Sequence, residues 1–163
     1  MKRTFKIYIL SAAFLLGAVC MNAQVADFEK YAKAEGTTYA YISQTMLELI
    51  ENGGSVSVPG MDMAEFAGRL TSMQIINCDT EQSCGHLKSD VADIVKAQKY
   101  ELLMQTSEEG LEADIYIKEG KKSSVLILEI DSGDTVCCIV IAGKFSAKDM
   151  LEALDKSTLR ISR

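Results

Sequence analysis

Four strands are predicted by residues 100–142, which read YELLMQTSEEGLEADIYIKEGKKSSVLILEIDSGDTVCCIVIA. The first two runs alternate apolar and polar residues, a pattern typical of strands with one buried and one exposed face. The runs 125–130 and 136–142 are almost continuously apolar, which favours interior strands covered on both sides. Short turns separate all four runs, and turns of this length favour antiparallel neighbours. We therefore expect a four-stranded antiparallel meander.

Helical periodicity dominates the half of the chain that precedes this meander. Ser43 resembles an N-cap, and Asp62 followed by Glu65 begins a second apolar stripe that includes Phe66, Leu70 and Met73. Further helices are expected before Gly36, from about Ser83 and from Ser146, and further strands over residues 37–42 and 74–77. The prediction is an α+β fold, in which an antiparallel β-sheet gains strands from the N-terminal half and carries helices packed mainly on one face.

Residues 1–23 have the pattern of an export signal. Three basic residues come first, the apolar run Ile7 to Val19 follows, and Ala23 offers a small residue at a cleavage point. The run is shorter than the roughly 20 residues that a membrane span needs. We therefore expect residues 24–163 to form a single domain, periplasmic or secreted, without a transmembrane segment.

Cys20 raises the alternative of a lipoprotein. Val19 stands where a small residue usually precedes a lipidated cysteine, and Gly17 stands in the place of the usual leucine. Both departures disfavour lipidation.

The charge balance excludes some partners. The whole chain carries a net charge of −6, and three of its 17 basic residues but none of its 23 acidic residues lie before Gln24. The remainder therefore carries a net charge of −9, which repels phosphates at long range. We expect no nucleic acid among the partners.

Four cysteines follow the predicted signal. In an exported protein an even number favours disulfides, and four cysteines allow three pairings. Cys78 and Cys84 are the first candidates, because they flank a polar segment that can close a small loop. Cys137 and Cys138 are neighbours in a predicted strand, so their side chains should point to opposite faces. Two small apolar residues are favoured there over a vicinal redox switch, and a bond from either to the Cys78 region stays open.

The first candidates for a metal or catalytic site are Cys78, Cys84 and His86. Thiolate and imidazole are good zinc ligands, but the Cys-x5-Cys-x-His spacing lacks the usual close pair, and His86 is the only histidine. Residues two apart on a helix do not share a face, which disfavours a Cys84–His86 catalytic pair. Met61 and Met63 offer thioethers for copper, although apolar packing at a helix start explains them equally well. We predict no cofactor and no catalytic residue.

One resemblance covers nearly the whole chain after the signal. The resemblance rests on four segments: Asn22-Ala23-Gln24, residues 36–43 before an amphipathic helix, residues 100–104, and a late hydrophobic strand followed by Gly143. In this layout the chain resembles a family of small exported Bacteroidetes proteins known as domain of unknown function 4252. The resemblance implies an envelope protein, with a link to envelope signalling through neighbouring sigma and anti-sigma factor genes. It carries no catalytic residue across.

Two functions remain open from the sequence. The first is a non-enzymatic binding or interaction module of the cell envelope, whose partner is another envelope protein or a small ligand. The second is a thiol- or metal-dependent site, zinc or redox, centred on Cys78, Cys84 and His86.

Overall fold

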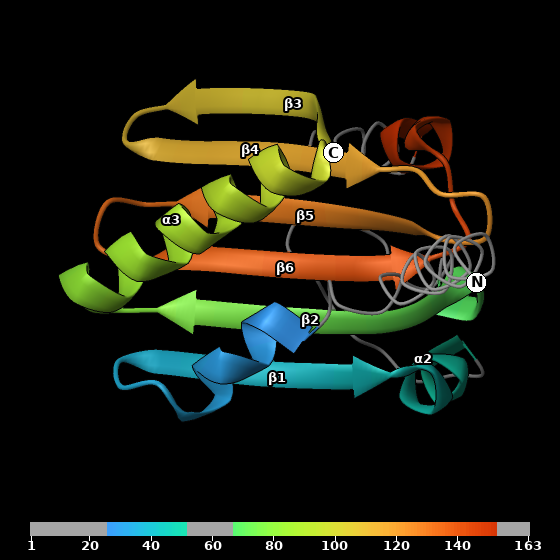
Figure 1. Ribbon diagram of the computed structural model, residues 1–163, viewed down its shortest axis with the longest axis horizontal. Coiled ribbons are helices and arrows are strands. Elements are labelled where there is room, and N and C mark those ends of the chain that lie inside the picture. Colours follow the sequence, from blue (N-terminus) through green and yellow to red (C-terminus); the bar gives the residue numbers. More distant parts are fainter. Residues whose placement is uncertain (1–25, 52–66, 153–163) are drawn as a thin grey trace, which may run out of the picture. The chain divides into compact units, whose positions relative to one another are not determined.

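The computed structural model describes residues 26–51 and 67–152, which contain one six-stranded antiparallel sheet with the strand order β1-β2-β6-β5-β4-β3 (Figure 1). The chain divides into two compact units, residues 1–30 and 31–163, and the whole sheet belongs to the second. The strands are β1 (Thr37–Ser43), β2 (Leu70–Cys78), β3 (Glu101–Glu108), β4 (Leu111–Lys118), β5 (Ser124–Asp131) and β6 (Val136–Gly143). The helical elements are η1 (Ala26–Lys33), α2 (Gln44–Glu51), η2 (Ala67–Arg69), α3 (Glu81–Gln98) and residues 147–152.

The predicted meander is confirmed. β3 to β6 pair in succession, and β1 and β2 extend the sheet beyond β6. Glu109 and Gly110 have φ angles of 47° and 88°, the left-handed values that a tight two-residue hairpin requires between β3 and β4. The α+β class and the additional strands from the N-terminal half are confirmed as well.

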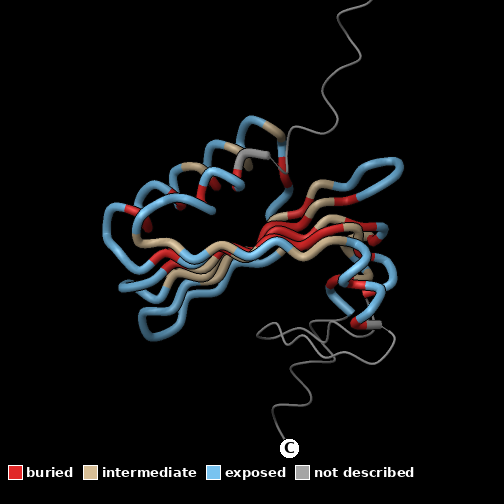
Figure 2. The backbone as a smooth tube through the Cα atoms, turned by 90° about the horizontal axis from the view of Figure 1, so that it is seen from below, coloured by how far each residue is buried: buried red, intermediate tan, exposed pale blue. Residues whose placement is uncertain are grey.

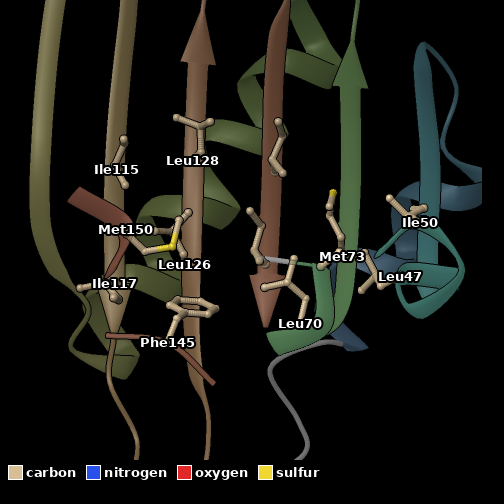
Figure 3. Packing of buried hydrophobic residues seen from close by; sticks show 13 residues of the cluster. Leu47, Ile50, Leu70, Met73, Ile115, Ile117, Leu126, Leu128, Phe145 and Met150 are labelled. Carbon is tan, nitrogen blue, oxygen red and sulfur yellow. The ribbon is translucent and has the colours of Figure 1, made fainter. Parts of the chain in front are cut away.

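The helices cover both faces of the sheet, whereas the sequence suggested mainly one (Figure 2). The core face carries the main hydrophobic cluster, to which α2 contributes Leu47 and Ile50, and residues 147–152 contribute Met150 (Figure 3). The opposite face, here called the α3 face, lies beneath α3, which contacts β2 and β6. The apolar runs of β5 and β6 explain the difference, because a strand that is apolar on both sides needs cover on both sides.

The helix predicted through Leu70 and Met73 is wrong at these two residues. Both lie in β2, while Asp62 and Phe66 lie outside the described residues. The register of β2 against β6 shifts between Leu70 and Ser72, so an extra residue, Thr71, is accommodated as a β-bulge. A bulge turns residues three apart toward the same face. Leu70 and Met73 therefore both join the core cluster with a spacing that imitates a helix.

α3 begins with a capping box. Thr80 is its N-cap, and the Thr80 and Ser83 side chains each accept a hydrogen bond from the other's backbone N–H. Its inner face buries Cys84, Leu87 and Val91, and Ile94 on the same face is half-buried. Lys99 ends the helix in the left-handed conformation, with φ 56°. No helix within the described ranges is long and apolar enough to cross a membrane.

Candidate functional site

A cavity of about 420 Å³ lies where the turn before β1 meets the start of α3. One wall comes from the end of η1 and the turn that follows it, and the other from the first two turns of α3. The lining residues are Tyr31, Ala34, Glu35, Thr37, Thr80, Gln82, Ser83 and His86. Most of them are polar, and all belong to the unit that contains the sheet.

Gly36 holds the two walls together. Its carbonyl oxygen accepts hydrogen bonds from Ser83 Oγ at 2.9 Å and from Asp79 N at 3.2 Å. Its φ is +68°, and a Cβ at this position would lie 2.7 Å from Thr80 Oγ1 and Thr80 Cγ2. Glycine is required here for both conformation and space.

Hydroxyl groups in the walls are already engaged. Thr37 Oγ1 lies 2.7 Å from the carbonyl oxygens of both Tyr31 and Ala34 and can donate its one hydrogen to either, and the Thr80 and Ser83 hydroxyls bond each other at 2.7 Å. The Tyr31 hydroxyl donates to the Asp90 carboxylate. Burial, followed by this hydrogen bond, raises the pKa of Tyr31 well above its ordinary value, so its hydroxyl stays protonated.

Three exposed side chains remain to face a ligand, and they belong to Glu35, Gln82 and His86. Together they offer a carboxylate, an amide and an imidazole, which can both donate and accept hydrogen bonds. These groups can therefore form hydrogen bonds with a small polar molecule.

Cys78 and Cys84 come together, but His86 does not join them. Both cysteines are buried, and Cys84 Sγ donates to the Cys78 carbonyl oxygen at 3.3 Å. His86 is exposed and lines the cavity, as expected for residues two apart on a helix. Within the described ranges, no group of three or more His, Cys, Asp or Glu side chains is placed to hold a metal ion.

Cys78, Cys137 and Cys138 lie in surroundings that favour the protonated thiol. Burial raises the pKa of Cys78, although a hydrogen bond from Ser83 opposes this, and burial also raises the pKa of Cys137. Complete burial raises the pKa of Cys138 well above its ordinary value. Cys137 packs against the core cluster while Cys138 lies opposite Ile76 on the α3 face, so the two point to opposite faces as predicted. The four cysteines in the part of the chain that the structure describes are free thiols, and the disulfide between Cys78 and Cys84 stays a prediction.

A comparison with protein families matches residues 31–153 to the model described as Domain of unknown function (DUF4252). The chain belongs to the DUF4252 family. The matched range contains the whole sheet and every residue that lines the cavity. No curated protein and no solved structure is significantly similar to the chain.

This DUF4252 domain also gathers four carboxylates on its α3 face. Glu112 lies opposite Asp131, and Asp114 lies opposite Glu129, across the pairing of β4 and β5. The Lys88 ammonium forms an ion pair with Asp131 and holds the pKa of that carboxyl below its usual range. Burial, opposed by Lys88 and assisted by Asp114 and Asp131, raises the pKa of Glu129 to about 7. Like charges directly opposite each other destabilise a sheet, so we expect the stability of this cluster to depend on pH.

Sequence reasoning found one of the residues that face the cavity, His86, and assigned it to a different site. Glu35 and Gln82 were missed because the walls meet only in the folded chain. The one local signal was the pair Thr80 and Ser83, whose spacing is that of a capping box.

Proposed function

We propose that this DUF4252 domain is a non-enzymatic binding module of the cell envelope, and that the cavity at the start of α3 holds its ligand. The observation that carries the proposal is the cavity itself, whose volume of about 420 Å³ is that of a small-molecule site. The envelope location rests on the signal pattern of residues 1–23, which lie outside the described residues.

The ligand class follows from the groups that face the cavity. Glu35 supplies an acceptor, and the Gln82 amide and the His86 imidazole each offer both a donor and an acceptor. The neighbouring hydroxyls of Thr37, Thr80 and Ser83 bond one another or the backbone and fix the walls. A ligand of this site is a small polar molecule with both donors and acceptors.

Binding is favoured over catalysis by the state of the possible nucleophiles. The thiolate is the reactive form of cysteine, and burial opposes its formation at Cys78 and Cys138. His86 faces the cavity and Cys84 the interior, so no imidazole is positioned to take the Cys84 proton.

The thiol or metal alternative keeps one specific observation in its favour. Cys84 Sγ lies against the Cys78 carbonyl, which places two thiols in one buried region at the end of β2. An oxidant that reached this region would find both cysteines together.

Native mass spectrometry of the protein extracted from its own envelope tests the proposal. We expect a bound small molecule that is lost in the double variant Gln82→Ala and His86→Ala. The control variant Lys96→Ala, in the last turn of α3, should retain it. Equal retention by both variants, or turnover of the bound molecule, would contradict the proposal. A bound metal ion that disappears with Cys84→Ala would favour the alternative instead.

A further inference from the structure

The outer edge of β3 lies at the opposite end of the sheet from β1 and from the cavity walls (Figure 1). Every residue of β3 except Leu103 is exposed. The six residues Leu102–Ser107 are uncharged, in a chain that is 25% charged. Soluble proteins usually protect a sheet edge with a proline, with a lysine or with an inward-pointing charged residue. β3 has none of these along its centre, although its bulge at Leu103 shortens the edge that is available for pairing.

The hydrogen-bonding phase of β3 follows from its hairpin with β4. The two-residue turn at Glu109 and Gly110 makes Glu108 and Leu111 a hydrogen-bonded pair, and the pattern alternates along the strand. Gln105 and Ser107 therefore direct their backbone N–H and C=O groups away from β4. The backbone hydrogen bond from Ser132 N to Thr135 O shows which residues of β5 and β6 bond each other. Following the residue pairings from β5 to β4 and then to β3 gives the same result for Gln105 and Ser107.

Apolar side chains flank this edge on both faces. Met104 is 36% exposed and shares the core face with Leu111, which is 48% exposed. Leu102, which is 52% exposed, lies on the α3 face. An added strand would cover apolar surface on each side while it satisfies the outward backbone groups of Gln105 and Ser107.

Charges at the two ends of β3 select the occupant. Glu101 begins the strand, and Glu108 and Glu109 stand at its other end. Two copies of β3 paired antiparallel over their full length would place Glu101 of one copy opposite Glu108 of the other. Like charges opposite each other are destabilising, whereas Lys or Arg at these positions would be favourable. The edge therefore discriminates against a second copy of the chain and in favour of a strand with basic ends.

We propose that the β3 edge binds an extended segment of another protein as a seventh strand, and that this segment has an uncharged, β-prone centre with Lys or Arg at both ends. Backbone hydrogen bonds to Gln105 and Ser107 supply affinity, and the glutamates at the ends of β3 supply selectivity. This surface is separate from the cavity, so the inference goes beyond the proposed function and does not depend on it.

The test uses the labelled peptide Lys-Thr-Val-Thr-Val-Thr-Lys and the same peptide with Glu in place of each Lys, titrated by fluorescence anisotropy. We expect saturable binding of the Lys peptide and about tenfold weaker binding of the Glu peptide, from opposite-charge pairs at two ends. Two N-methylated forms of the Lys peptide carry methyl groups on alternate sets of backbone amides. Only one set faces β3, so the form methylated on that set should not bind. Amide hydrogen exchange should slow at Gln105 and Ser107 when the peptide binds.

Two variants locate the site. Gln105→Pro removes an outward N–H that the sheet does not use, so it should abolish peptide binding while circular dichroism stays unchanged. The double variant Glu101→Lys and Glu108→Lys should reverse the preference between the two peptides, even if the proline variant fails to fold. Glu48→Lys with Glu152→Lys makes the same change in net charge away from β3 and should leave the preference as it was.

Three results would overturn the proposal. The first is the absence of saturable binding by the Lys peptide. The second is equal binding of both N-methylated forms. The third is concentration-dependent protection of Gln105 and Ser107 in the protein alone, which would make a second copy of the chain the occupant.

Discussion

Replacing Glu129 by glutamine is expected to stabilise the protein above pH 7 and to leave its stability near pH 4.5 almost unchanged. Glu129 lies on the α3 face opposite Asp114, with Asp131 and Lys88 nearby. Burial is the largest cause that raises its pKa from 4.5 to about 7. The folded state therefore binds more protons than the unfolded state between these two values. The free energy of unfolding falls as the pH rises through this window, and glutamine removes that loss.

The magnitude follows from the shift. A change from 4.5 to about 7 corresponds to at most about 3.4 kcal/mol, at about 1.36 kcal/mol for each unit of pKa. Glu129 is only partly buried, so solvent screening reduces the expected gain to about 1–2 kcal/mol. Asp114 Oδ1 is buried and has no hydrogen-bond partner among the described residues. The amide of glutamine can donate a hydrogen bond to this oxygen at any pH. The Glu129 carboxyl can do so only while it is protonated, below about pH 7.

Urea unfolding at pH 5, 6, 7 and 8 measures the effect. The difference in free energy of unfolding between Glu129→Gln and the natural protein should grow across this range. Glu108→Gln, an exposed control at the end of β3, should give a small and constant difference. The reasoning is refuted if the Glu129→Gln difference is the same at pH 5 and pH 8, or if the control shows an equal rise.

Three further outcomes are expected from the same structure. Gly36→Ala places a Cβ 2.7 Å from Thr80 at a φ of +68° and should lower the free energy of unfolding by about 2 kcal/mol in urea. At Gly85 an added Cβ would meet no atom within 4 Å, so the control Gly85→Ala should raise the free energy of unfolding by about 0.5–1 kcal/mol. Thr80→Ala removes the cap of α3 and should lower the free energy of unfolding by about 1 kcal/mol, with Thr106→Ala as an exposed control. Cys138 is fully buried with a raised pKa, so peptide mass mapping should find it unmodified by maleimide at pH 7 until the protein unfolds.

The sheet could be predicted from sequence because its signals are local. Each hairpin of the meander has its own turn residues. Each strand has its own pattern, either an alternation, as in the run from Leu111 to Lys118, or an almost continuous apolar run, as in residues 136–142. The failure at Leu70 and Met73 has an equally local cause. Their spacing of three comes from a β-bulge, which a residue pattern alone does not distinguish from one turn of helix.

The cavity could not be predicted in this way. Gly36 and Thr80 are 44 positions apart in the sequence, and only the folded chain brings them into contact. The sequence marked the Cys78–His86 segment as chemically interesting but could not show which of its side chains lie together. In the structure Cys84 points into the interior, whereas His86 lines the cavity.

One turn of α3 therefore serves both candidate sites. Gln82 lines the cavity, Ser83 bonds the Gly36 carbonyl that joins the two walls, and Cys84 contacts the end of β2. A displacement of Cys84 toward Cys78, as disulfide formation would require, would move Ser83 and with it the wall of the cavity. The binding proposal and the thiol alternative are thus mechanically linked through residues 82–84. A loss of ligand in a Cys84 variant cannot by itself assign the function to the thiol, and only the Gln82 and His86 variants, which leave both thiols in place, separate the two.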